Sequence, residues 1–234
     1  MHNIAVNLEK VRRTILACAS EFDRDPADIR LLAVSKTHPP QAVVTALEQG
    51  QIEFGESYLQ EAIPKIDTLA GCGARWHYIG RIQTNKTRDL AAHFDWVQTV
   101  DRERVAQRLN DQRPESLPPL NICLQVNVDQ EPQKAGAHPH DLLPLAAAVR
   151  QMPRLKLRGL MAIPAEGADF EAQRRPFAAL RQLFEQLQGE GYLLDTLSMG
   201  MSGDMRAAIA EGSTLLRIGT AIFGERVKAE AAGG

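Results

Sequence analysis

A lysine follows an apolar segment of the sequence, in a position where its amine could do chemistry. Residues 29–34 are mostly apolar and predict a strand, and Lys36 comes two positions after it. An amine beside an apolar pocket loses hydration, which lowers its pKa and leaves it nucleophilic. Most lysines lie at the surface, so position alone slightly favours a lysine that extends into solvent.

Two glycine-rich segments near the other end of the chain have residue types that bind anions. One is SMGMSGD (residues 198–204) and the other is RIGTAIFG (residues 217–224). Glycines let backbone N–H groups approach an anion, and a helix that starts there adds free donors and a positive dipole. Ser202 and Thr220 add hydroxyl donors. Each glycine can also simply end a strand, so this pattern alone leaves both interpretations open.

The elements that would position these residues alternate along the chain. A first helix over about 2–22 has an apolar stripe, and eight short apolar strands follow, with helical patterns between them. The predicted strands cover 29–34, 52–54, 76–79, 95–100, 121–128, 157–163, 196–199 and 215–218, and a last helix covers Ala221 to Ala229. Eight such units predict an α/β fold, a single (β/α)₈ TIM barrel over about 28–228 with an extra N-terminal helix. An open doubly wound sheet is the alternative.

In such a barrel, binding groups lie at the carboxyl ends of the strands. Lys36 follows the first strand, and the two glycine-rich segments follow strands seven and eight, where this architecture commonly binds phosphate. That agreement favours a phosphate site, and all three segments face one mouth. Pyridoxal phosphate (PLP), held as a Schiff base, is a small molecule that uses both an amine and a phosphate site.

Arg217 ends the eighth predicted strand, beside the second glycine-rich segment. It could bind the phosphate or face the pyridine nitrogen of PLP. In the second position, its positive charge would disfavour protonation of the nitrogen and make the ring a poorer electron sink for carbanion chemistry.

Several motifs span most of the chain. They are LAVSKTHP (32–39), FGESY (54–58), WHYIG (76–80) with QTNK (83–86), SMGMS (198–202) with Asp204 and Met205, and RIGTAIFG (217–224). With these motifs the chain resembles the pyridoxal phosphate homeostasis proteins, also described as YggS-like proteins or proline synthase co-transcribed homologues. That family resembles the barrel domain of bacterial alanine racemase and of eukaryotic ornithine decarboxylase, the fold type III PLP-binding barrel.

The resemblance implies roles for individual residues. Lys36 would form the Schiff base, and Arg217 would lie opposite the pyridine nitrogen. His77 would lie near the ring, packing against it or bonding its substituents. Ser202, Gly219 and Thr220 would hold the phosphate. The chain departs from the family at two positions: Ser57, a predicted cofactor-binding residue, replaces the usual Asn of FGEN, and Arg81 stands where a proline or other small group is frequent.

The resemblance also implies a function: binding PLP and taking part in its intracellular homeostasis without evident catalysis, with PLP-dependent apo-enzymes as recipients. One alternative is a PLP-dependent amino-acid racemase or a decarboxylase-like enzyme, and another is a phosphate-binding barrel enzyme unrelated to PLP. A two-base racemase needs acid/base groups on both faces of its substrate. In alanine racemase the second group is a tyrosine from an additional domain, and eight βα units are expected to use nearly all of these 234 residues.

Composition bounds the remaining classes. The 27 basic residues and 29 acidic residues give a formal net charge of −2, which argues against nucleic-acid binding. No apolar run approaches the roughly 18 residues of a membrane span, and the N-terminus lacks a signal-peptide core. Cys18, Cys72 and Cys123 form no CxxC pair, so reduced thiols and no metal site are expected. We therefore expect one PLP-binding domain over 1–234, cytoplasmic and monomeric.

Overall fold

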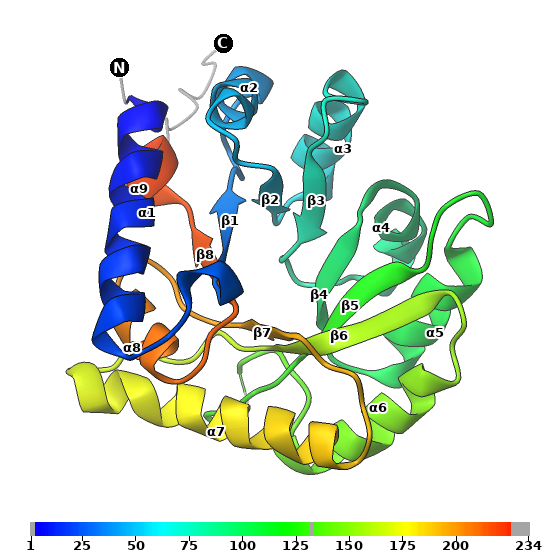
Figure 1. The fold of residues 1–234 in the computed structure, drawn as a ribbon. Coiled ribbons are helices and arrows are strands. Elements are labelled where there is room, and N and C mark those ends of the chain that lie inside the picture. Colours follow the sequence, from blue (N-terminus) through cyan, green and yellow to red (C-terminus); the bar gives the residue numbers. More distant parts are fainter. Residues whose placement is uncertain (1–2, 132, 226–234) are drawn as a thin grey trace.

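Parallel strands close into a barrel in the computed structural model, which describes residues 3–131 and 133–225 (Figure 1). The strands are β1 (Arg30–Val34), β2 (Glu53–Glu56), β3 (Arg75–Tyr78), β4 (Trp96–Val100), β5 (Leu120–Gln125), β6 (Leu155–Met161), β7 (Thr196–Ser198) and β8 (Leu215–Ile218). They follow one another around the barrel in sequence order, and β8 closes it by pairing with β1 in the register Ala33 to Ile218. The predicted closed barrel is confirmed, and the open sheet is wrong.

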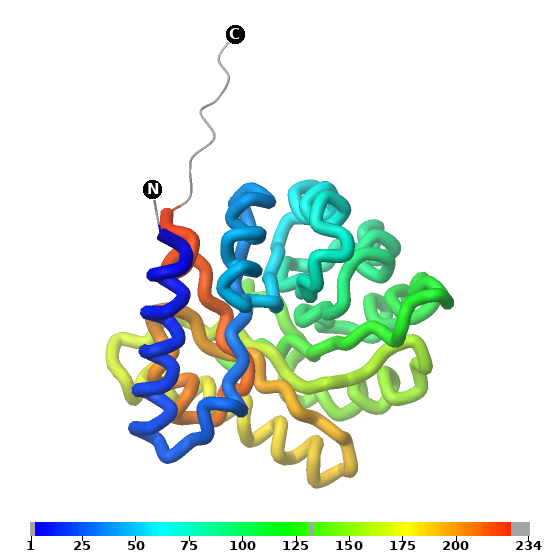
Figure 2. Tube along the Cα trace, turned by 45° about the horizontal axis from the view of Figure 1, so that its top comes forward, coloured from blue at the N-terminus to red at the C-terminus, as the bar shows by residue number. Residues whose placement is uncertain are grey.

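Helices form the outer layer around the strands (Figures 1 and 2). They are α1 (Ile4–Glu21), α2 (Pro40–Glu48), α3 (Leu59–Thr68), α4 (Thr87–His93), α5 (Glu103–Gln112), α6 (Leu142–Arg150), α7 (Phe170–Gly189), α8 (Met205–Ala210) and α9 (Thr220–Phe223), with short 3₁₀ turns η1 (Pro26–Asp28), η2 (Thr84–Lys86) and η3 (Pro139–Asp141). Among the described residues, no helix is both long and apolar enough to cross a membrane.

The extra helix α1 lies beside α9, against the outside of the barrel (Figure 2). Its N-cap Asn3 accepts a hydrogen bond from the backbone of Val6, and its apolar stripe is buried. Asn7 of this helix donates to the carbonyl of Ile222 over 2.9 Å. The helix therefore fixes the position of α9, which begins with Thr220 and lies within the predicted phosphate-binding segment.

The sequence placed some element ends wrongly. The helix expected over 221–229 ends at Phe223, because Gly224 adopts φ +87°, and residues 226–229 lie outside the described part. So do residue 2 of the first predicted helix and the expected barrel limit at 228. The second strand lies later than predicted and includes Glu56, since that carboxylate has a buried partner on α3.

The apolar core has two parts. The larger one lies between the strands and the helices and includes Phe54, Leu90 and Phe177. A smaller cluster of Trp96, Cys123 and Met161 occupies part of the barrel interior. Burial raises the pKa of the Cys123 thiol to about 12, so this cysteine stays protonated and acts as a small apolar side chain.

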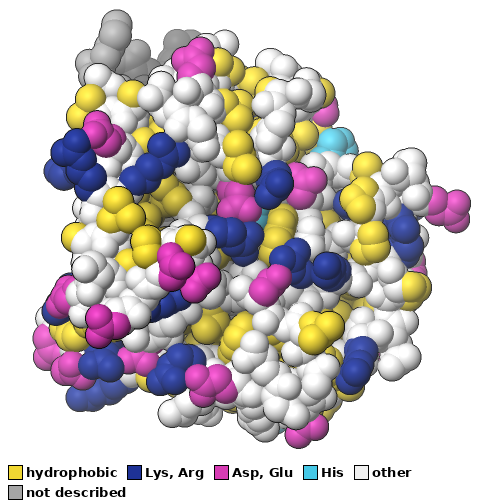
Figure 3. All heavy atoms as spheres, in the orientation of Figure 1, with side chains coloured by type: hydrophobic (Ala, Val, Ile, Leu, Met, Phe, Trp, Pro, Cys, Tyr) yellow, Lys and Arg dark blue, Asp and Glu magenta, His cyan; other side chains and the backbone are white. Residues whose placement is uncertain are grey.

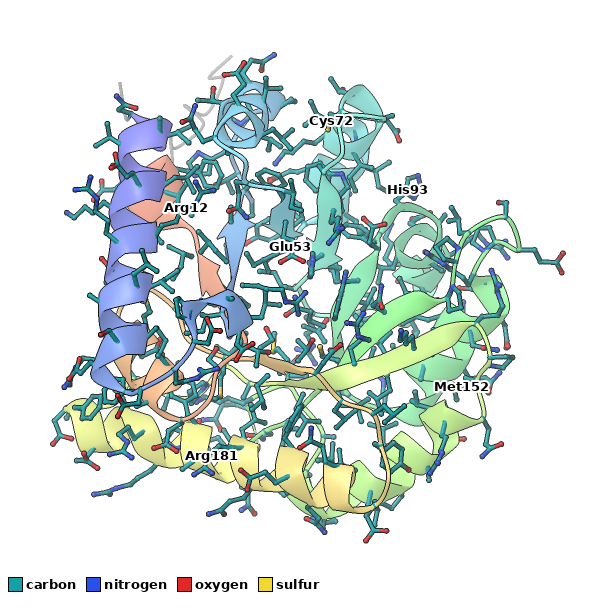
Figure 4. The ribbon with its side chains drawn as sticks, in the orientation of Figure 1. Arg12, Glu53, Cys72, His93, Met152 and Arg181 are labelled. Carbon is teal, nitrogen blue, oxygen red and sulfur yellow. The ribbon has the colours of Figure 1, made fainter. Side chains whose placement is uncertain are left out.

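Charged side chains lie where several strands begin. Arg30 of β1 pairs with Glu53 of β2 over 3.1 Å, and Arg158 of β6 forms an ion pair with Asp195 just before β7. Both guanidinium groups also lie over the ring of Trp96. Basic and acidic side chains gather near the centre of the face seen in Figure 3, and Figure 4 labels Glu53 between β1 and β3. These contacts link neighbouring strands near the amino end of the barrel.

Gly159 provides a test of the strand packing. A Cβ atom at this position would lie 1.7 Å from the carbonyl oxygen of Thr196 on β7, so β6 and β7 can approach only with glycine here. We expect Gly159→Ala to lower the free energy of unfolding by roughly 2–3 kcal/mol, measured by urea denaturation. Gly189→Ala, at the end of α7 with open space around it, is the matched control and should be neutral or slightly stabilising. Equal stability of the two variants would contradict this packing.

Candidate functional site

The predicted site residues lie at the carboxyl ends of neighbouring strands. Strand β1 pairs with β2 on one side, in the register Val34 to Gly55, and with β8 on the other. Lys36, two residues beyond β1 and half-buried, therefore lies level with Ser57 beyond β2. Barrel closure places the segment that follows β8 at the same end.

A glycine in each of the two glycine-rich segments lies close to its neighbours, and Gly200 also has a backbone conformation that favours glycine. Gly200 adopts φ +96°, and a Cβ there would lie 2.5 Å from the side chain of Ala208. Gly219 packs so closely on β1 that a Cβ would lie 3.3 Å from the carbonyl oxygen of Val34. The second segment thus lies directly beside the end of β1, the strand that precedes Lys36.

The two predicted phosphate-binding hydroxyls are open to solvent. Thr220 is the first residue of α9, where backbone N–H groups lack acceptors within the helix. Ser202 lies in the turn between β7 and α8, and Asp204 holds this turn by accepting a hydrogen bond from the backbone of Met201. Both side chains are free of the core and available to a ligand.

Arg217 lies inside the barrel below these turns. Its Nη1 donates to the carbonyl and hydroxyl oxygens of Ser198, over 2.6 and 2.8 Å, and its Nη2 donates to the carbonyl of Ala162 over 2.8 Å. A guanidinium has five N–H donors, so two of them, including Nε–H, have no acceptor among the described residues. Burial lowers the pKa of Arg217 to about 10, which still leaves it charged at neutral pH.

His77 is connected to Arg217 through two residues that the sequence did not single out. Gln98 donates through Nε2 to Nδ1 of His77 over 2.8 Å, and the hydroxyl of Ser198 donates to Oε1 of Gln98 over 2.5 Å. Arg217 completes the chain by donating to the same hydroxyl. The polar residues Gln98 and Ser198, both at fully buried strand positions, were the available signal for it.

His77 itself is fully buried and stacks on Trp96, with 5.0 Å between ring centroids. Burial lowers its pKa well below the usual value, and Arg30 and Arg75 lower it further. Because Nδ1 accepts a hydrogen bond, the neutral ring carries its proton on Nε2. Its place inside the barrel supports a role in positioning Ser198 and Arg217; contact with a ligand ring stays a prediction.

A buried ion pair lies directly beside Lys36. Lys65 of α3 donates to Oε1 of Glu56 over 2.7 Å and to the carbonyl of Ser35 over 2.9 Å, while the Ser35 hydroxyl donates to the same carboxylate oxygen over 2.7 Å. Glu56 is fully buried, which raises its pKa, and the Lys65 ammonium and the Ser35 hydroxyl oppose that shift. This ion pair was not predicted from the sequence, although Lys65 falls on the inward face of its helix with Ala62.

The residue after Lys36 is also anchored. Thr37 adopts φ +67°, a conformation that costs a β-branched residue free energy, and its backbone N–H donates to Glu61 over 3.1 Å. Lys36 therefore stands between two positions whose backbone is fixed by hydrogen bonds from α3. Ser35 and Thr37 limit where the amine can reach.

Removal of Lys65 should be costly. Lys65→Met leaves the Glu56 carboxylate buried without its partner, and we expect a loss of roughly 3–5 kcal/mol in the free energy of unfolding. The double variant Glu56→Gln with Lys65→Met removes both charges and should recover much of that loss. Lys10→Met, at an exposed position of α1, is the control. Urea denaturation at pH 7 measures all three, and a Lys65→Met loss no greater than that of Lys10→Met would contradict the assignment.

Comparisons with known proteins show the family of this chain. The family model described as "Alanine racemase, N-terminal domain" matches residues 6–227. The pyridoxal phosphate homeostasis protein of Pseudomonas aeruginosa is 55% identical over 226 residues, covering 97% of each chain. That of Escherichia coli K12 is 51% identical over 229 residues, covering 97% of this chain and 98% of the relative.

Solved structures give the same result. PipY of Synechococcus elongatus, determined with PLP bound, superposes with a TM-score of 0.82 at 36% identity, over 95% of this chain and 100% of that one. Alanine racemase of Corynebacterium glutamicum shares the fold with a TM-score of 0.70 at 14% identity, over 99% of this chain and 62% of that one. By its motifs, its barrel and these full-length matches, the chain belongs to the family of pyridoxal phosphate homeostasis proteins.

Proposed function

We propose that this chain holds PLP as a Schiff base on Lys36 and takes part in intracellular PLP homeostasis. The observation that carries the proposal is the meeting of Lys36, Arg217 and the Gly219–Thr220 turn at one end of the barrel. The PLP-bound structure of the 36% identical PipY supports it.

The residues present fit the cofactor group by group. Lys36 supplies an amine for an aldehyde, and Gly219, Thr220 and Ser202 supply donors for a phosphate. Ser57 supplies a hydroxyl at the neighbouring strand end. The N–H groups that Arg217 does not use inside the barrel would face the ring nitrogen, and the chain from His77 would hold that guanidinium in place.

Bound PLP supplies an electron-withdrawing ring, whose strength as an electron sink depends on protonation of its nitrogen. Arg217 is charged and fixed by three hydrogen bonds, so it disfavours a second positive charge on that nitrogen. We therefore assign to the site the holding of PLP, without evident catalysis.

A racemase would need a second acid/base group besides Lys36, and a tyrosine is the residue type that supplies it in alanine racemase. Tyr78 donates its hydroxyl to the carbonyl of Arg81, and Tyr192 packs against Arg150. Tyr58, 49% exposed at the mouth, is left as the tyrosine able to act as a second base.

The remaining parts of the proposal concern the whole chain. Residues 1–234 act as a single PLP-binding domain, in the cytoplasm and as a monomer, and PLP-dependent apo-enzymes receive the cofactor. The curated relatives, matched over 97% or more of their length and named for PLP homeostasis, support the role in homeostasis.

Reduction with borohydride tests the Schiff base. After incubation with excess PLP and reduction, peptide mass spectrometry should find the pyridoxyl group on Lys36. Lys36→Arg should lose the label and the visible absorbance, whereas Lys10→Arg should keep both. Absence of the Lys36 adduct in the unaltered chain would sink the proposal.

Deuterium exchange tests the absence of catalysis. The holoprotein, incubated with L-alanine in deuterated water, should show neither rapid exchange of the α-proton nor racemisation, measured by NMR and chiral chromatography. Rapid exchange that Tyr58→Phe abolishes would instead establish a racemase with Tyr58 as its second base.

The phosphate turn can be tested by one substitution. Thr220→Val removes a hydroxyl that serves as a phosphate donor but leaves the exposed start of α9 intact. We expect roughly fivefold to tenfold weaker PLP binding with an unchanged melting temperature. Thr14→Val, on the exposed face of α1, is the control. Unchanged affinity in Thr220→Val would mean that the phosphate is held elsewhere.

A further inference from the structure

A separate cavity opens at the mouth, across the barrel from β7 and β8. It has a volume of about 720 Å³ and lies among the loops that follow β2, β3 and β4. Its lining comes from residues 57–60, Tyr78, residues 81–86 and Arg102. Ser57 is the one predicted cofactor-binding residue in this lining, so the cavity borders the proposed PLP site but is built from other residues.

The cavity carries positive charge without carboxylates. Arg81, Lys86 and Arg102 line it, and none of its lining residues is Asp or Glu. Arg102 forms an ion pair with Asp101, which lies outside the lining. Within residues 3–131 and 133–225, neither Arg81 nor Lys86 has a salt bridge or a side-chain hydrogen bond. Two basic side chains without an acidic partner in one concave site favour an anionic ligand.

The loop that carries these cations is held rigidly. The carbonyl of Thr84 accepts hydrogen bonds from Arg108 and Thr87, over 2.9 and 3.0 Å, and the Tyr78 hydroxyl donates to the carbonyl of Arg81. A Cβ on Gly80 would lie 2.2 Å from the carbonyl oxygen of Ser57, so the loops after β2 and β3 are closely packed. A preformed site loses little entropy when a ligand binds.

The uncharged residues that line the cavity indicate which kind of anion it would bind. Tyr58, Leu59 and Ile82 add an aromatic and apolar wall, and Gln83 and Asn85 add amide groups. The volume falls in the range of pockets that bind small molecules. Guanidinium and ammonium groups recognise phosphate through charge-assisted hydrogen bonds. An apolar wall beside such groups suits a ligand whose phosphate is attached to a ring.

We propose that this cavity is a second, non-covalent binding site for a small phosphorylated molecule with an aromatic or apolar body. The site does not depend on Lys36 and therefore stands apart from the proposed function. It would give the mouth two phosphate sites, one on each side of the amine.

Calorimetric titration with phenyl phosphate tests this site, because the probe has a ring and a phosphate but no aldehyde to react with Lys36. The protein is saturated with PLP and reduced with borohydride, and mass spectrometry records Lys36 labelling separately. We expect saturable binding at a single site, stronger than that of inorganic phosphate or of phenol. The double variant Arg81→Gln with Lys86→Gln should bind at least roughly tenfold more weakly at an unchanged melting temperature.

A charge-matched variant provides the control. Arg88→Gln with Arg104→Gln removes two exposed positive charges from the neighbouring helices α4 and α5, outside the cavity lining, and should bind like the unaltered chain. Equal weakening in both variants, no saturable binding at millimolar concentration, or equal affinity for inorganic phosphate would overturn the proposal. Loss of the Lys36 label with phenyl phosphate binding intact would count against the proposed function alone.

Discussion

The buried ion pair between Glu56 and Lys65 determines how the end of β1 is built. Both side chains are almost completely removed from water, which costs several kcal/mol per charge. One carboxylate oxygen recovers part of this cost by accepting from Lys65 and Ser35, whereas Oε2 has no partner among the described residues. Such a pair is weak evidence for stability, but it fixes geometry. Lys65 of α3 donates to the carbonyl of Ser35, and Glu56 of β2 accepts from the Ser35 hydroxyl, so the residue before Lys36 is held from both sides. A lysine at the end of a strand thereby becomes an amine held at a defined point of the mouth.

Arg217 depends on barrel closure in a comparable way. It belongs to β8, yet it donates to carbonyl groups of Ala162, just after β6, and Ser198 of β7. An open sheet could bring β7 and β8 together, but the link through Gln98 to His77 crosses the interior to β4 and β3. The interior is thus divided between this polar chain and an apolar cluster of Trp96, Cys123 and Met161. The Arg217 guanidinium at the base of the mouth is thus linked to residues of β7, β4 and β3, which closure of the barrel brings together with β8.

The sequence predicted those features that follow from position along one strand. Alternation of strands and helices gave the barrel, and the rule that strand ends face one mouth was sufficient to bring Lys36, Gly219 and Thr220 together. The sequence could not reveal the partners of Glu56 and Arg217, because Lys65 looks like any helix lysine until the fold brings it to Ser35 and Glu56. Strand two was placed too early for the same reason: its final residue is charged, and only the tertiary partner makes that residue compatible with a buried strand. Gly224 ended the last helix earlier than its apolar pattern indicated.

The positive character of the mouth arises from the placement of carboxylates, not from an excess of bases. The whole chain has a formal net charge of −2. Away from the mouth, arginines are neutralised by acidic partners, as Arg206 is by Glu21, Arg158 by Asp195 and Arg174 by Glu211. At the mouth, Arg217 has carbonyl and hydroxyl acceptors instead of a carboxylate. Arg81 and Lys86, on the far side of the same opening, have neither kind of partner among the described residues. Basic groups without a carboxylate partner at a concave opening attract anions. Two phosphate sites on opposite rims would follow from this placement of charge.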